Sequence, residues 1–205
     1  MNDLNIAGSL LFISGVVSVM GIITAETTYP GYSTRTNYIS DLGATRPPNS
    51  VIKQPAATIF AVTVVISGVL TLASAYFVYR GLGQGGSVAA LSLLLALSGI
   101  GALGASAFNE QHFALHTLFS FISFTTVSLA ALVSYFILRA PFCYFAVILG
   151  VIALASFGSL IIFGTIYGEE AGPIASRIGL GGVERWISYP ITLWSIGLGA
   201  YLMGQ

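Results

Sequence analysis

Apolar residues in this chain fall into long runs that are separated by shorter polar stretches. Each run is close to the length of about 20 residues that an α-helix needs to cross the hydrocarbon core of a bilayer. We therefore expect an all-α, multi-pass membrane protein with one domain, residues 1–205, built as a bundle of six transmembrane helices. The expected helices cover residues 4–25, 54–79, 87–108, 112–138, 142–167 and 183–203.

The composition supports a membrane protein and excludes several other classes. Hydrophobic residues make up 56% of the chain and charged residues only 7%, with a mean hydropathy of +0.90. A soluble domain needs more polar surface than this. The net charge is zero, so there is no electrostatic basis for binding nucleic acid. Cys143 is the only cysteine, which rules out an internal disulfide, and we expect it to be a small buried residue.

The first apolar run starts without a basic segment and is longer than the core of a signal peptide. It is therefore expected to be a retained spanning helix. Small residues recur in the third run, where Gly99, Gly101 and Gly104 follow Ser98 closely. Such residues let helices approach one another, which predicts a tight bundle.

The charged residues are distributed unevenly between the two predicted membrane faces. Counting helices places the two long connections, 26–53 and 168–182, on one face, together with the turn at 109–111. We call this face the loop end, and the opposite face, with both chain termini, the termini end. Only Asp3, Arg80 and Arg139 belong to the termini end. The charged residues of the loop end are Glu26, Arg35, Asp41, Arg46, Lys53, Glu110, Glu169, Glu170, Arg177, Glu184 and Arg185.

This distribution leaves the helix interiors without charge, so a transporter or channel is disfavoured. Arg80 and Arg139 each stand alone in a short turn, as a minimal cytoplasmic anchor does. Although the loop end holds more basic residues, it also holds more acidic ones. We expect the protein in the cell membrane with its long loops on the outer face.

The second long connection contains Glu169 and Glu170, which are expected in a solvated turn.

The first long connection carries a candidate site. Pro30 and Gly31 indicate a turn, and Ser40 or Asp41 can cap a short helical turn that Gly43 ends. Ser40 and Asp41 are then candidate catalytic residues, either as a nucleophile with an acid or as a ligand with the group that orients it. The alternative is a folded loop that an Arg35–Asp41 ion pair holds in place.

The turn before the fourth helix carries a second candidate site. His112 and His116 are four residues apart, so they share one face of a helix and can grip a divalent metal together. Glu110 precedes them as a candidate base or third ligand, and Asp41 or Glu184 can add another ligand. The alternative is that one imidazole bonds a backbone carbonyl and the other lies at the membrane interface. His116 is the stronger catalytic candidate, because a buried imidazole needs a partner.

A third candidate site opens the last helix. Gly179, Gly181 and Gly182 precede a helix start, where free N–H groups can bind an anion. Arg185 in the first turn can grip a phosphate or a carboxylate, and Glu184 suits the positive end of the helix. Further along the helix, we expect Trp186 and Tyr189 to be aromatic anchors at the membrane interface. Pro190 is expected to kink the helix, and Trp194 to pack between helices.

Three sets of motifs together resemble a prokaryotic membrane family, the domain of unknown function nine-nine-eight. They are Tyr-Pro-Gly-Tyr with Asn-Tyr-Ile-Ser-Asp-Leu-Gly, Phe-Asn-Glu followed by His, and Gly-x-Glu-Arg followed by Tyr-Pro and Trp. The resemblance implies six spanning helices. It also implies that the functional polar positions are Asn37, Ser40, Asp41, Glu110, His116, Glu184 and Arg185, with Asn37, Glu184 and Arg185 as candidate ligand-binding residues. His112 does not fall on this pattern.

The Ile-Ser-Asp-x-Gly core also resembles eukaryotic membrane proteins that remodel GPI anchors or modulate autophagy. Those proteins follow the core with Pro-Glu, whereas this chain has Arg46-Pro47-Pro48-Asn49. Two functions remain open from the sequence. One is a protein that binds or hydrolyses a membrane lipid at the loop end, and the other is a non-catalytic subunit of a larger membrane complex. The expected partners are membrane lipids and other membrane subunits.

Overall fold

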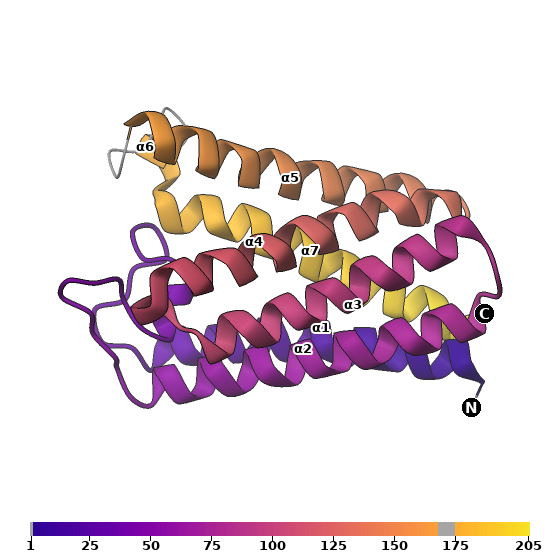
Figure 1. Cartoon of the computed structure of the whole chain (residues 1–205), viewed down its shortest axis with the longest axis horizontal. Helices are drawn as coiled ribbons and strands as arrows, with labels where there is room; N and C mark the ends of the chain where they lie inside the picture. The colour runs from indigo at the N-terminus through magenta and orange to yellow at the C-terminus, as the bar shows by residue number, and fades with distance from the viewer. Residues whose placement is uncertain (1, 168–174) are drawn as a thin grey trace.

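The computed structural model describes residues 2–167 and 175–205, which form α-helices and connecting loops without any strand (Figure 1). The long helices are α1 (Asp3–Thr27), α2 (Ala56–Gly81), α3 (Gly86–Ala107), α4 (Phe113–Val133), α5 (Phe142–Tyr167) and α7 (Leu180–Met203). The short elements are η1 (Ser40–Leu42), η2 (Glu110–His112), η3 (Ser134–Phe136) and α6 (Ala175–Ile178). The predicted Glu169–Glu170 turn lies outside the described residues.

The all-helical class is confirmed, and the long helices match the six predicted ranges. Five of them, α1 to α5, are long and apolar enough to cross a membrane. Helix α7 is as long as its neighbours, but Trp, Tyr, Ser and Thr side chains and the internal Pro190 lower its hydropathy. It is also rich in buried residues, so much of its surface meets protein rather than lipid. Its crossing of the membrane stays a prediction.

The long helices form a closed ring in which each packs against its neighbour in the chain. Helix α7 closes the ring, because it packs against both α5 and α1 and also touches α4. In Figure 1, both termini lie at one end of the bundle, and the long loop between α1 and α2 lies at the other. The predicted placement of both termini and of the first long loop is therefore confirmed, while residues 168–174 of the second lie outside the described residues.

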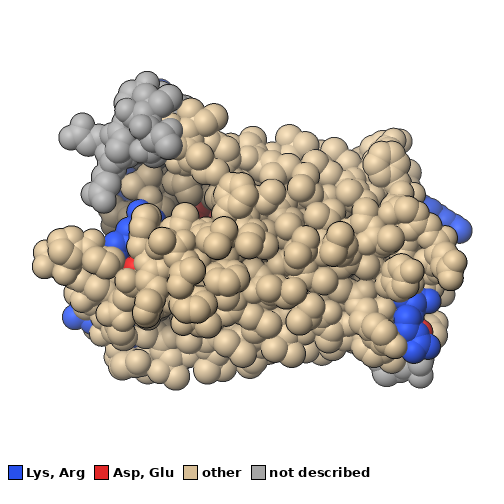
Figure 2. Space-filling view, viewed as in Figure 1, with Lys and Arg blue, Asp and Glu red and all other residues tan. Residues whose placement is uncertain are grey.

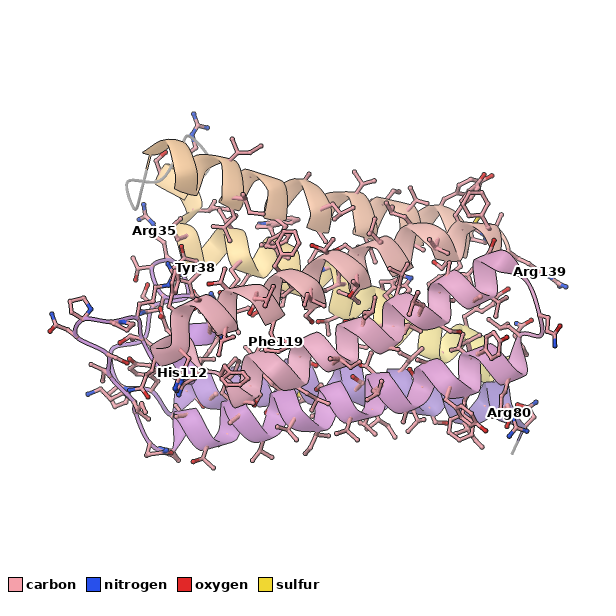
Figure 3. The ribbon with its side chains drawn as sticks, viewed as in Figure 1. Arg35, Tyr38, Arg80, His112, Phe119 and Arg139 are labelled. Carbon is pink, nitrogen blue, oxygen red and sulfur yellow. The ribbon has the colours of Figure 1, made fainter. Side chains whose placement is uncertain are left out.

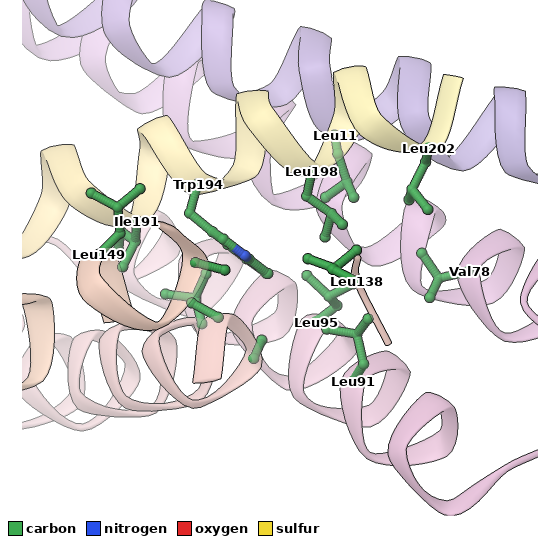
Figure 4. Close-up of a cluster of buried hydrophobic side chains, with 14 of the residues drawn as sticks. Leu11, Val78, Leu91, Leu95, Leu138, Leu149, Ile191, Trp194, Leu198 and Leu202 are labelled. Carbon is green, nitrogen blue, oxygen red and sulfur yellow. The ribbon is translucent and has the colours of Figure 1, made fainter. Parts of the chain in front are cut away.

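The half of the bundle near the termini is filled by aliphatic side chains from several helices (Figure 4). Trp194 of α7 is fully buried there, and its indole N–H donates to the Ser134 hydroxyl at 3.3 Å. The predicted packing role of Trp194 is thus confirmed, and so is the burial of Cys143. The remaining fully buried members include Leu11, Val78, Leu91, Leu95, Leu198 and Leu202.

The predicted close approach of helices at glycines is also confirmed. A Cβ added to Gly99 would lie 2.8 Å from the Gly68 carbonyl oxygen of α2, and one on Gly101 would lie 2.6 Å from the Ser123 nitrogen of α4. Both distances are shorter than real Cβ contacts, so α3 touches both neighbours backbone to backbone at these residues.

The surface shows the expected separation of charge. In Figure 2 the visible charged side chains lie at the two ends, and the belt between them is uncharged. At the termini end, Arg80 pairs with Asp3 at 3.1 Å. Arg80 and Arg139 lie at that end, and Arg35, Tyr38 and His112 at the loop end (Figure 3).

Candidate functional site

The loop between α1 and α2 is folded into the end of the bundle rather than lying on it. Its short helix η1 is buried, with Ser40 and Asp41 only 9% and 8% exposed. Leu42 and Ile39 anchor it in a small apolar cluster with residues of α1 and α2. The predicted short turn ended by Gly43 is confirmed, although its N-cap is Ile39, which makes no side-chain cap. Burying η1 brings Ser40 against Glu110 of η2 and places the start of η1 beside α7.

Glu110 is the centre of this buried polar cluster. The Asn109 side chain caps η2 through the Gln111 N–H, and this turn directs Glu110 inward, where it is 2% exposed. The Ser40 hydroxyl donates to Glu110 Oε1 at 2.8 Å, and Arg46 Nε donates to Glu110 Oε2 at 3.0 Å. Both carboxylate oxygens are therefore satisfied, as a buried charge requires.

The Arg46 guanidinium is also held by two aromatic rings. It lies 4.5 Å from the centre of the Tyr38 ring and 5.0 Å from that of Phe113. Cation–π contacts of this kind fix a guanidinium that is still about a third exposed, at 37%. Arg46 thus forms the outer border of the cluster.

His116 is oriented by the backbone. Its Nδ1 lies 2.8 Å from the Phe108 carbonyl oxygen and 3.0 Å from that of Ala105. Carbonyl oxygens only accept, so Nδ1 carries the hydrogen and Nε2 carries the lone pair of the neutral ring. Nε2 lies 3.3 Å from the Ser120 hydroxyl and 3.5 Å from Glu110 Oε1. The ring therefore connects Ser120 to the Glu110 cluster.

Glu184 reaches the same region from the first turns of α7. Its carboxylate accepts the backbone N–H of Ile39, which fixes η1 against α7. Glu184 is 7% exposed. Four of the predicted residues, Ser40, Glu110, His116 and Glu184, are thus brought together.

Asp41 and Asn37 lie beside this cluster but turn toward their own loop. Asp41 Oδ2 accepts from the Tyr38 N–H at 2.8 Å and from the Asn37 amide at 3.3 Å. Burial raises the pKa of the Asp41 carboxyl, and these two hydrogen bonds oppose that shift. The predicted Arg35–Asp41 pair is wrong, because Arg35 lies toward α6 and donates to the Ser176 carbonyl.

Arg185 holds the loop and does not offer a free anion site. It pairs with Glu26 of α1 and donates to the Tyr32 hydroxyl at 2.8 Å. It also donates to the backbone carbonyls of Thr34, Asn37 and Gly181. These contacts engage both terminal nitrogens of the guanidinium, so the predicted phosphate grip is replaced by a tether between α1, the loop and α7.

The glycines at the start of α7 serve the same tether. The Gly181 N–H donates to the Arg35 carbonyl at 3.1 Å, and a Cβ on Gly181 would overlap the Asn37 carbonyl oxygen. Gly179 adopts a positive φ of 79°. The predicted anion site at this glycine-rich start is therefore occupied by the protein's own loop.

His112 and His116 do not share one helix. His112 ends η2, is exposed and packs edge-on against Phe108, while His116 is in α4 and buried. Within residues 2–167 and 175–205, no three His, Cys, Asp or Glu side chains are grouped to hold a metal ion. The alternative arrangement holds instead, with one imidazole bonded to a carbonyl and the other at the surface. The metal site stays a prediction from spacing alone.

Two adjoining cavities meet at the polar cluster, and Ser40, His116, Ser120, Phe124 and Glu184 line both. The first, which we call the lateral cavity, has a volume of about 350 Å³. Its other lining residues are Tyr38, Arg46, Glu110, Phe113, Thr117, Phe121, Phe157, Leu160, Ile161 and Leu180. The second, the inner cavity, has a volume of about 170 Å³ and extends into the bundle. Its further hydroxyl-bearing lining residues are Ser18, Thr63, Ser67, Ser123, Ser188 and Thr192.

Sequence reasoning did not identify Arg46, Tyr38 or Ser120 as site residues. For Ser120 there was a usable signal, because His116 and Ser120 are four residues apart and share one face of α4. For Arg46 there was none, since its contact with Glu110 joins residues 64 positions apart.

The fold and site define a multi-pass membrane protein with a buried polar cluster beneath one membrane face. More specifically, the chain belongs to the family described as "Protein of unknown function (DUF998)", whose model matches residues 12–201. The predicted resemblance to this family is thereby confirmed. No curated protein and no solved structure matches the chain.

Proposed function

We propose that the protein binds a membrane lipid in the lateral cavity, with the lipid headgroup at the Ser40–Glu110–His116 cluster. The observation that carries this proposal is the two-sided lining of the cavity. Ser40, Glu110 and Arg46 form its polar end, while Phe157 and Leu160 of α5 contribute apolar wall. A lipid has the same division between a polar head and an apolar chain.

The cavity also borders the surface that faces lipid. Phe121 of α4 and Ile161 of α5 line it, yet they are 48% and 42% exposed on the outside of the bundle. An acyl chain can therefore enter sideways between α4 and α5 without leaving the bilayer. A water-soluble ligand would instead have to pass the buried loop that covers the loop end.

The charges of the cavity indicate the kind of headgroup. Glu110 and Glu184 contribute two carboxyl groups, whereas Arg46 is the basic residue among the described lining residues and is already paired with Glu110. With Arg46 paired, the described lining offers a bare phosphate monoester no free cation to offset its charge. The site favours headgroups that donate hydrogen bonds, through hydroxyl or ammonium groups.

Lipid analysis tests this proposal. We expect the protein, purified gently in detergent, to retain lipid at about one molecule per chain, enriched in hydroxyl- or amine-bearing headgroups over phosphatidic acid. Leu160→Trp fills the cavity and should remove that lipid. Leu118→Trp is the matched control, because Leu118 is 51% exposed on α4 and does not line the cavity. Equal retention by both variants would refute the proposal.

A second candidate is a non-catalytic subunit of a membrane complex. The network of Arg185, Glu26 and Tyr32 favours it, because such a network fixes the loop between α1 and α7 by structural contacts alone. This candidate predicts that other membrane proteins copurify with the chain in a fixed ratio. Copurification in that ratio from both wild type and Leu160→Trp would favour it over the lipid site.

We propose that the protein lies in the cell membrane with its termini end on the cytoplasmic side and its loop end on the outer side. The single arginines Arg80 and Arg139 at the termini end support this, as positive residues favour the cytoplasm. A green fluorescent protein fused after Gln205 should then fluoresce, and an alkaline phosphatase fused there should be inactive. The reverse pair of results would invert the orientation.

A further inference from the structure

We infer that Ser120 is the nucleophile, and His116 the base, of an acyl-lipid hydrolase whose active site lies where the lateral and inner cavities meet. This inference rests on the proposed function, since the substrate is a lipid acyl ester held in the lateral cavity. The cleaved bond is the ester bond between a fatty acyl group and the lipid alcohol.

The first support is the chain of hydrogen bonds through His116. The Nδ1–H is fixed on the carbonyl oxygens of Phe108 and Ala105, so the Nε2 lone pair is left for the Ser120 hydroxyl at 3.3 Å. A nucleophile, a base and a group that orients the base are the three members of a serine-hydrolase triad. Here backbone carbonyls take the orienting role.

The second support is the position of Glu110. Its Oε1 lies 3.5 Å from His116 Nε2. When Nε2 takes up a proton, this carboxylate faces the positive imidazolium and stabilises it. Ser40 and Arg46 fix the carboxylate, so it needs no rearrangement during the reaction. The Ser40 hydroxyl donates to Glu110 rather than to an imidazole nitrogen, which makes Ser120 the better nucleophile.

The third support is the pair of cavities. Ser120 lines both, so its hydroxyl can meet an acyl ester from the lateral side and water from the inner side. The lining of the inner cavity includes hydroxyl groups of Ser18, Ser67, Ser123 and Ser188. A cavity of this size with several hydroxyl groups in its lining has room and partners for a water molecule.

The reaction proceeds in two balanced steps. Ser120 Oγ bonds to the ester carbonyl carbon while its proton passes to His116 Nε2, and the bond to the lipid alcohol then breaks as that oxygen takes the proton. A water molecule next adds to the acyl-Ser120 carbonyl and gives a proton to Nε2. The bond to Ser120 breaks, Ser120 Oγ regains the proton, and a free fatty acid leaves.

A serine-reactive fluorophosphonate probe tests this inference on the full chain in lipid nanodiscs. We expect labelling of the wild type, with the modified peptide containing Ser120, and no labelling of Ser120→Ala. His116→Gln should slow labelling at least about 100-fold, the contribution of a positioned general base. The matched control is Ser128→Ala. Ser128 is a buried serine of the same helix that lines neither cavity, and its hydroxyl has no hydrogen-bond partner among the described residues.

The outcomes separate the two proposals. A wild type that retains lipid but is not labelled, or is labelled at another serine, overturns the inference and leaves lipid binding intact. A wild type that neither retains lipid nor is labelled contradicts both the lipid-binding proposal and the hydrolase inference. Helicity and retained lipid in Ser120→Ala show that this variant is folded, so that its lost labelling reports the missing nucleophile.

Discussion

Arg46 Nε and Glu110 Oε2 lie 3.0 Å apart, which joins the first long loop to the turn before α4. Glu110 is almost fully buried in this pair, while Arg46 remains partly exposed. The pair therefore fixes the loop beside the lateral cavity, which both residues line. Because their burial differs, substitutions of the two residues should differ in cost.

The first prediction concerns this pair. Glu110→Gln should destabilise the protein by about 1–3 kcal/mol, because Ser40 and Arg46 lose a charged acceptor in a buried site. Arg46→Gln should cost less, since Arg46 is partly solvated, and the double variant should cost less than the sum of the two. Thermal unfolding followed by circular dichroism measures all three. Additive costs would show that the contact contributes no coupling.

The second prediction concerns the close approach at Gly181. Gly181→Ala should cost about 1–3 kcal/mol, because its Cβ would strike the Asn37 carbonyl and push the loop from α7. Gly158→Ala is the matched control. Gly158 also lies in a helix and has open space where a Cβ would lie, so alanine there should be neutral or stabilising by up to about 1 kcal/mol. Equal effects at both sites would contradict the close packing.

The third prediction concerns the Arg185 tether. Arg185→Lys should cost about 1–3 kcal/mol, because an ammonium group cannot reach Glu26, Tyr32 and the loop carbonyls together. Limited proteolysis should then cut residues 28–38 sooner. Arg139→Lys, at the termini end, should stay within about 0.5 kcal/mol of the wild type and leave the loop protected. An unchanged proteolysis pattern in Arg185→Lys would show that Arg185 does not hold the loop.

The fourth prediction concerns pH. Burial raises the pKa of the Asp41 carboxyl, so the folded state binds this proton more tightly than the unfolded state does. The resulting stability is present below the ordinary pKa of an aspartate and is lost as the pH rises through the raised value. Asp41→Asn removes this titration while keeping an oxygen for both the Tyr38 and Asn37 bonds, which share Oδ2. The melting temperature of the variant relative to wild type should therefore rise from about pH 4 to about pH 8. A constant difference would contradict the assignment.

The helices were predictable because each long apolar run signals its own structure locally. Helix α7 gives a weaker apolar signal than the other long helices, because a helix buried among its neighbours needs less hydrophobicity than one that faces lipid. Its Pro190 and Trp194 are buried, and packing against neighbouring helices compensates for the weak local signal.

The candidate site was only partly predictable, because long-range contacts decide which polar groups meet. The sequence identified Ser40, Glu110, His116 and Glu184, which the fold brings together. It misread the glycines before Arg185 as an anion site, since nothing local shows that the loop occupies them. It also placed His112 on one helix with His116, whereas Asn109 caps a separate turn that ends at His112.

The most direct test of the central claim is an experimental structure of the protein in lipid nanodiscs, inspected at the lateral cavity. We predict elongated density between α4 and α5, with its polar end within hydrogen-bonding distance of Ser40, Glu110 or His116 and its chain against Phe157 and Leu160. A cavity closed by side chains, with Ser40, Glu110 and His116 bonded only to one another, would contradict lipid binding at this site.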